Sequence, residues 1–217
     1  MIMNNAKKEI LELLHCDPLI AAIRDENGFR AALESNIPVI FLLNSNILSL
    51  AQQCEQLAAQ NKKVFVHIDL VDGLSSVPVA VDFISQMTPA AGILTTHGSI
   101  IKRAAELNLL SIYRIFMLDG VALQRAKRNI DKTRPNFLEI MPGMMPTIIE
   151  RLTDYTRIPV IAGGLLTQDV DIRNALRAGA VGVSSTNPDL WGRCFSLQAP
   201  DAQAGQEERP EHAGEKG

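Results

Sequence analysis

A complete strand–helix–strand unit is visible in residues 160–188, which have the sequence VIAGGLLTQDVDIRNALRAGAVGVSSTNP. The run 160–163 is short and apolar, as expected for a buried strand. The apolar residues of 172–178 have helical spacing, and Gly179 is typical of a helix end. A second apolar run, 181–185, follows at once. This succession predicts a parallel βαβ unit.

The same alternation extends over most of the chain. Eight short apolar runs start 18 to 28 residues apart, and helical patterns lie between them. They predict an α/β fold, a (β/α)8 TIM-barrel-like single domain over residues 1–197, with a doubly wound open sheet as the alternative. No G-x-G-x-x-G follows the first run, which disfavours the open sheet. The predicted strands are 19–24, 39–44, 64–70, 92–96, 110–116, 137–141, 160–163 and 181–185, after an opening helix at 6–14.

The composition is that of an ordinary globular protein. Of the 217 residues, 47% are hydrophobic and 21% are charged, which excludes disorder throughout. The longest apolar run, 37–43, is far shorter than the roughly 20 residues of a membrane span, so no membrane association is expected. Cys16, Cys54 and Cys194 are odd in number and lack C-x-x-C spacing. With no apolar signal core at the first residues, they predict a reducing, cytoplasmic location.

Residues 198–217 differ sharply from the rest. They are rich in Ala, Gln, Glu, Gly and Pro, and they carry the whole net charge of −3. Such a segment buries too little apolar surface to repay its ordering entropy, so it is predicted to be a disordered acidic tail. An acidic interaction tail is the alternative. The remaining chain is neutral, unlike the strongly basic domains that usually bind nucleic acids.

Polar residues gather at the carboxyl ends of the predicted strands, which meet at one mouth in a parallel barrel. Alternation places His67 and Asp69 on the inward face and allows the same orientation for Glu139. Arg114 lies in the later half of its strand. These groups form either a ring of ion pairs, to which Arg24 would contribute, or a ligand site. In a ligand site, Asp69 and Glu139 would act as an acid–base pair or accept hydrogen bonds from ligand hydroxyls.

The loops after the seventh and eighth predicted strands resemble a phosphate site. Adjacent glycines let a ligand approach the backbone, and the hydroxyls of the following unit add donors. Asn187-Pro188 is typical of the start of a short helix, whose dipole favours anions. Barrels usually bind phosphate at this place, so phosphate or another small oxyanion is predicted. The candidate ligands are Gly163, Gly164, Ser184, Ser185 and Thr186.

Two classes of site are disfavoured. No lysine falls at the carboxyl end of a predicted strand, where a Schiff-base aldolase needs one. The chain has no H-E-x-x-H, and His67 with Asp69 supplies too few ligands, so no metal site is predicted.

Residues 125–134 form a locally basic segment. It is either a solvated helix face or a surface for RNA phosphates. Aromatic residues make up only 5% of the chain, which favours contacts to the shape and phosphates of a hairpin over base stacking. The candidate residues are Arg125, Lys127, Arg128, Lys132 and Arg134.

Six short segments occur in a distinctive order: VHIDL at 66–70, GILTT at 92–96, RIFMLD at 114–119, FLEIMPG at 137–143, AGG at 162–164 and STNPDLW at 185–191. Together they resemble the glycerol uptake operon antiterminator regulatory proteins, and the resemblance covers residues 16–192. It implies a TIM-barrel-like regulator rather than an enzyme. Such a protein responds to glycerol 3-phosphate as its effector ligand and prevents transcription termination in the leader mRNA of glycerol-metabolism genes. No cofactor is implied.

The resemblance also implies roles for the matching residues. The glycines and hydroxyls of 163–186 would hold the phosphate, while Asp69 and Glu139 would take the glycerol hydroxyls with Arg114 nearby. The basic segment 125–134 becomes a candidate surface for a leader mRNA hairpin. A neutral body predicts weak, salt-sensitive RNA binding unless the ligand or a homodimer concentrates the charge.

One position departs from the family pattern, and two other functions stay open. His97 stands where a basic residue often follows the threonines, which would make a phosphate contact dependent on pH. The first alternative is a TIM-barrel isomerase or lyase that acts on a small phosphorylated metabolite through Asp69 and Glu139. The second is a barrel that serves as a protein-interaction scaffold.

Overall fold

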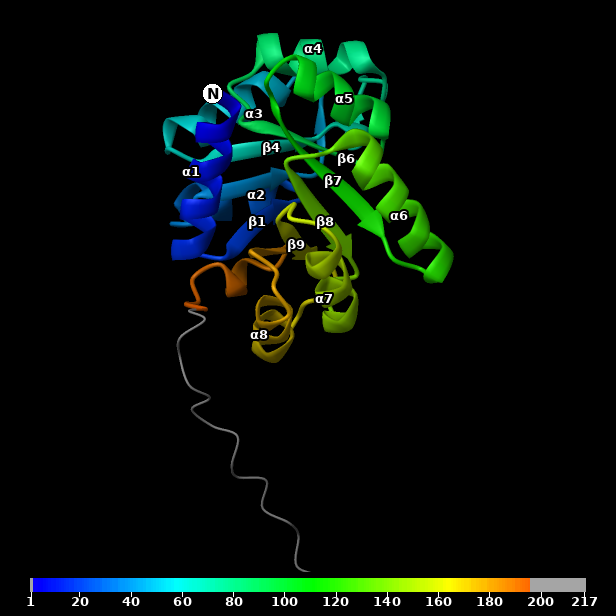
Figure 1. The fold of residues 1–217 in the computed structure, drawn as a ribbon. Helices are drawn as coiled ribbons and strands as arrows, with labels where there is room; N and C mark the ends of the chain where they lie inside the picture. Colours follow the sequence, from blue (N-terminus) through cyan, green and yellow to red (C-terminus); the bar gives the residue numbers. More distant parts are fainter. Residues whose placement is uncertain (1, 196–217) are drawn as a thin grey trace, which may run out of the picture.

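The computed structural model describes residues 2–195 and contains a closed barrel of parallel strands (Figure 1). The barrel strands are β1 (Leu19–Ile23), β2 (Val39–Leu42), β4 (Lys63–His67), β6 (Gly92–Thr95), β7 (Leu110–Phe116), β8 (Phe137–Met141), β9 (Val160–Gly163) and β10 (Gly182–Ser185). They pair in the closed order β1-β10-β9-β8-β7-β6-β4-β2. The TIM-barrel-like prediction is confirmed and the open sheet is wrong. The predicted tail, 198–217, lies outside the described residues.

Helices connect successive barrel strands and cover the outside of the barrel (Figure 1). After the opening helix α1 (Ile2–Cys16) they are α2 (Glu26–Glu34), α3 (Leu50–Ala59), α4 (Pro78–Met87), α5 (Gly98–Glu106), α6 (Gly120–Thr133), α7 (Pro146–Tyr155) and α8 (Asp169–Arg177), and a short 3-10 helix, η2 (Pro188–Leu190), follows β10. Their apolar stripes pack on the outward side chains of the strands, such as Val64 and Val66 of β4.

Aromatic and aliphatic side chains fill the inside of the barrel near the strand starts. The ring of Phe65 packs edge-on against Phe41 at 6.0 Å and near Phe137 at 6.5 Å between centroids. Ile10 and Leu14 of α1 join this inner cluster, so α1 closes the end where the strands begin. The polar side chains of the strands are therefore left to meet at the opposite, carboxyl end.

Most predicted strand boundaries agree with the structure within two residues, but the run 64–70 is divided. Strand β4 ends at His67, and Ile68–Leu70 forms a 3-10 turn, η1. The chain then pairs as β5 (Val71–Asp72) with β3 (Ser45–Asn46) in a separate two-stranded sheet. Asp69 belongs to the turn η1 between β4 and β5, so it is not a residue of a barrel strand.

Candidate functional site

A buried ion pair lies inside the barrel where β7 and β8 run side by side. Arg114 and Glu139 are paired in register on these strands, and Arg114 Nε donates to Glu139 Oε2 at 2.5 Å. Glu139 is 0% exposed and the Arg114 side chain 7%. The predicted ring of ion pairs is thus realised in part, since Arg24 is exposed instead. The guanidinium compensates a carboxylate that would otherwise be costly to bury.

Strands β9 and β10 complete the surroundings of Glu139. Ser184 Oγ donates to Glu139 Oε1 at 2.7 Å, so this hydroxyl belongs to the carboxylate network and is not a free phosphate donor. Gly163 is the register partner of Ser184. A Cβ atom on Gly163 would lie 2.5 Å from Glu139 Oε1 and 2.7 Å from Ser184 Oγ. Only glycine therefore leaves room for the network at this position.

The two loops predicted to bind phosphate follow β9 and β10, which are neighbouring strands of the barrel. Gly164 has φ of +74°, a left-handed conformation that glycine adopts without strain. Ser185 is buried, with its hydroxyl accepting a hydrogen bond from the backbone N–H of Asn187, and Thr186 is exposed. The predicted short helix is the single 3-10 turn η2, whose first turn contains Asp189. Its dipole contributes little to anion binding, because only three residues are aligned and one of them is acidic.

Asp69 points away from the position that strand alternation predicts. Its carboxylate accepts hydrogen bonds from Thr95 Oγ1 at 2.6 Å and from both the backbone N–H and Oγ1 of Thr96 at 2.8 Å. The prediction that Asp69 projects inward from a strand is wrong, because the backbone turns at η1 to meet these donors. The carboxylate binds the start of the next barrel loop instead.

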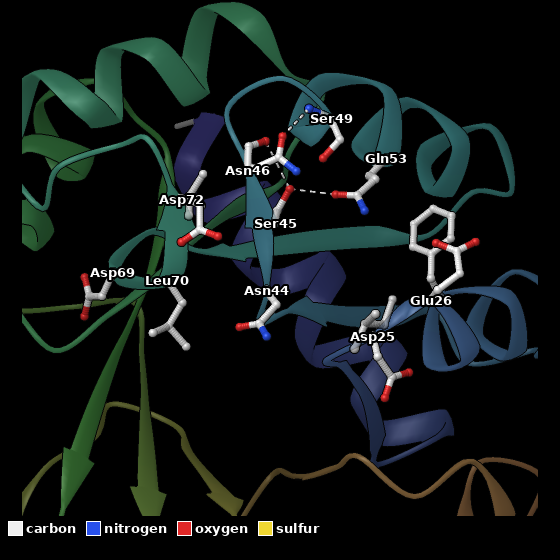
Figure 2. Close-up of a pocket in the computed structure, with 13 residues that line it drawn as sticks. Asp25, Glu26, Asn44, Ser45, Asn46, Ser49, Gln53, Asp69, Leu70 and Asp72 are labelled. Atoms are coloured by element: carbon white, nitrogen blue, oxygen red, sulfur yellow. Dashed lines mark hydrogen bonds between the residues drawn. The ribbon is translucent and has the colours of Figure 1, made fainter.

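A pocket of about 460 Å³ opens beside the barrel at the carboxyl ends of β1, β2 and β4 (Figure 2). Figure 2 shows Asp69 at its edge, with the carboxylate directed away from Asn44 and Leu70. The lining includes four carboxylates and no lysine or arginine: Asp25, Glu26, Asp69 and Asp72. It would repel a phosphate dianion, whereas ligand hydroxyls find acceptors there.

His67 is a buried residue that the sequence analysis placed on the inward face of its strand and judged insufficient, with Asp69, for a metal site. It ends β4 on the same face as Phe65, with 3% of its surface exposed. Burial, with the nearby Arg114 cation, lowers the pKa of His67 from 6.5 to about 4, while Asp69 acts in the opposite direction. The imidazole is therefore neutral at physiological pH. The sequence indicates this orientation, because His67 and Phe65 are two residues apart on one strand and their side chains therefore lie on the same face.

The basic segment 125–134 spans most of α6 and its end. Arg125, Arg128 and Lys132 are exposed and follow each other at helical spacing, so they form one stripe. Lys127 lies over the Tyr155 ring of α7 at 4.4 Å, and the Tyr155 hydroxyl donates to Asp131 at 2.5 Å. Asp131, the only acidic residue of the segment, and Lys127 therefore both contact α7. The exposed stripe of Arg125, Arg128 and Lys132 contains only basic residues.

Arg134 follows the last residue of α6. It caps α6 in a left-handed conformation with φ of +48° and is exposed. With Arg157 it lines a pocket of about 430 Å³ next to Pro135. The structure therefore brings three of the five predicted RNA-contacting residues, Arg125, Arg128 and Lys132, to one stripe of α6, while Arg134 lies beside Asp131 at the end of the helix.

Residues 2–195 contain neither a metal-ligand cluster nor a membrane-spanning helix. No group of three or more His, Cys, Asp or Glu side chains in this range has the arrangement of a metal site. None of the helices in the same range is long and apolar enough to cross a membrane.

The lowered pKa of His67 predicts a specific loss of stability in acid. Between pH 6.5 and 4 the unfolded chain binds a proton at His67 that the folded chain excludes, so stability falls as the pH falls through this window. We expect the free energy of unfolding to fall by up to about 3 kcal/mol more in the wild type than in His67→Leu. Urea denaturation of both proteins across this range measures the difference. Parallel pH profiles would contradict the prediction.

Comparison with known proteins identifies close relatives of this architecture. The family model described as glycerol-3-phosphate responsive antiterminator matches residues 19–191. The Escherichia coli protein YgcP is 34% identical over 182 residues, covering 84% of this chain and 95% of YgcP. The glycerol uptake operon antiterminator regulatory protein of Listeria monocytogenes has a TM-score of 0.79 at 31% identity, covering 81% of this chain and 95% of its own. An antiterminator-related protein of Thermotoga maritima has a TM-score of 0.72 at 28% identity, covering 80% and 96%.

Proposed function

The chain belongs to the glycerol-3-phosphate responsive antiterminator family, and from this premise we propose that it is a glycerol 3-phosphate sensor that binds the leader mRNA of glycerol-metabolism genes. The proposal that it binds this ligand rests on the network of Arg114, Glu139 and Ser184 around Gly163 at the barrel mouth. A regulator of this kind works inside the cytoplasm, where the message is made.

The effector spans two chemically different parts of the mouth. Its phosphate lies against the backbone N–H groups of Gly163 and Gly164 and the hydroxyls of Ser185 and Thr186, all of which are donors suited to an anion. Its glycerol hydroxyls lie at the Arg114 side chain, which is 7% exposed and is paired with the fully buried Glu139 carboxylate. Asp69 supports this end through its bonds to the loop after β6. Ser184 positions Glu139 and does not contact the phosphate.

The RNA contacts lie on α6. Arg125, Arg128 and Lys132, with Arg134 beyond the helix, present positive charge to the hairpin phosphates, while Lys127 supports the helix against Tyr155. Such contacts give affinity that depends on salt and little on base sequence.

The β7–α6 connection links the two sites. Arg114 lies on β7, and the following loop ends at Asp119, whose side chain accepts from the Ala122 N–H and caps α6. A ligand that shifts Arg114 therefore acts on the element that begins the basic helix. A tenfold preference of the ligand for one state amounts to about 1.4 kcal/mol, which is enough to move a near-balanced switch.

The test is a titration of a glycerol-gene leader hairpin into the protein at several salt concentrations, with and without glycerol 3-phosphate. We expect the wild type to change its RNA affinity about tenfold with ligand. Arg128→Glu should weaken binding and lower the slope of log affinity against log salt by about 1, since one phosphate contact is lost.

The matched control is Arg30→Glu on α2, which lies between β1 and β2, on the opposite side of the closed barrel from α6. Arg30 is exposed and pairs only weakly with Glu26, so its reversal should leave the salt slope unchanged. Equal RNA affinities with and without ligand would overturn ligand control. Conversion of the ligand during the titration, seen by phosphorus NMR, would favour the isomerase or lyase alternative.

A further inference from the structure

One polar atom inside the barrel has no partner. Among the residues that the structure describes, Nδ1 of His67 is the buried side-chain nitrogen or oxygen without a hydrogen bond. Buried polar groups are nearly always hydrogen-bonded, because an unmade bond leaves the desolvation cost unrepaid. An isolated exception at a candidate site therefore indicates a group that is completed by something the protein binds.

The fold places His67 at the barrel mouth. It ends β4 and shares the inward face of Phe65, whose ring belongs to the inner cluster below. Arg114 and Asp69 both act on the charge of its ring, so the imidazole lies among the side chains of the candidate site.

The closed strand order sets His67 opposite the phosphate loops. Going round the barrel from β4, four steps in either direction lead to β9, which carries Gly163. A ligand whose phosphate lies on the β9 side therefore extends its other end across the mouth towards β4. The group that reaches His67 is the end farthest from the phosphate.

We infer that His67 is a specificity-determining residue, whose Nδ1 hydrogen-bonds a hydroxyl at the end of the effector farthest from the phosphate. The inference rests on the proposed function. An uncharged imidazole offers one donor and one acceptor nitrogen, which suits a neutral hydroxyl and adds no attraction for the phosphate. Ligands with a phosphate but no hydroxyl leave Nδ1 unpartnered and lose this contact, so His67 distinguishes a polyol phosphate from a plain alkyl phosphate.

The test compares three variants by isothermal titration with glycerol 3-phosphate and with propyl phosphate, which has no hydroxyl. His67→Leu removes both ring nitrogens and should weaken glycerol 3-phosphate binding about 10- to 100-fold, while propyl phosphate binding stays at the wild-type value. His67→Asn places an amide atom near the position of Nδ1, whereas His67→Gln reaches that of Nε2. His67→Asn should therefore bind glycerol 3-phosphate more tightly than His67→Gln.

A structural role would give a different pattern. If His67 only shaped the barrel, His67→Leu would weaken both ligands equally and would melt at a lower temperature than the wild type. We expect unchanged or higher melting without ligand, because the substitution removes an unpartnered buried polar atom. Equal glycerol 3-phosphate affinities for wild type and His67→Leu, or equal losses for both ligands, would overturn the inference alone. A wild type that does not bind glycerol 3-phosphate would overturn the proposed function together with it.

Discussion

Replacing Glu139 by alanine is expected to lower the free energy of unfolding by about 3 to 5 kcal/mol. The Arg114 guanidinium is 7% exposed, and Glu139 is its carboxylate partner inside the barrel. Without Glu139 the cation stays buried and uncompensated, and Ser184 loses the acceptor of its hydroxyl. The same variant should lose measurable glycerol 3-phosphate binding, because the network that holds the polyol end is removed.

Urea denaturation followed by circular dichroism measures this loss. Glu26→Ala is the matched control, since Glu26 pairs with Arg30 on the exposed face of α2, and its removal should cost less than about 1 kcal/mol. The double variant Arg114→Met/Glu139→Leu should recover most of the stability, because no buried charge is left. A Glu139→Ala loss no larger than the control would show that the pair is not buried as described.

Replacing Gly163 by alanine is expected to reduce glycerol 3-phosphate affinity about 100-fold and stability by about 1 to 3 kcal/mol. The added methyl group would lie 2.5 Å from Glu139 Oε1 and 2.7 Å from Ser184 Oγ, so both atoms must move. Arg114 donates a hydrogen bond to the other oxygen of the Glu139 carboxylate, and this bond limits how far the carboxylate can move. The strain therefore falls on the hydrogen bonds of the site.

Gly120→Ala is the control for this substitution. Gly120 is the first residue of α6, and a Cβ there meets nothing within 4 Å. Its stability should stay the same or rise by up to about 1 kcal/mol, since alanine favours helix. Titration calorimetry gives the affinities, and denaturation gives the stabilities. Wild-type affinity in Gly163→Ala would contradict the placement of Glu139 and Ser184 against this glycine.

The barrel and its strands were predictable because parallel strands buried on both faces are nearly all apolar and recur with their helices at regular intervals. Strands β7, β8 and β9 agree with prediction at both ends. The run 64–70 was predicted too long, since it stays apolar through Ile68 and Leu70 although the backbone has already turned. The turn depends on donors from Thr95 and Thr96, which alternation within one strand does not reveal.

The sequence by itself determined the fold class, the inward face of His67 and Glu139, and the basic character of α6, because these follow from periodicity and charge along one segment. Only the tertiary structure decided which partners meet. Glu139, Gly163 and Ser184 come from three strands, and the register of the closed barrel sets their contacts. The same register turns Ser184 towards a carboxylate and leaves Nδ1 of His67 without a partner. A hydrogen bond between distant segments depends on positions within about an ångström, and local sequence patterns do not specify the packing that sets them.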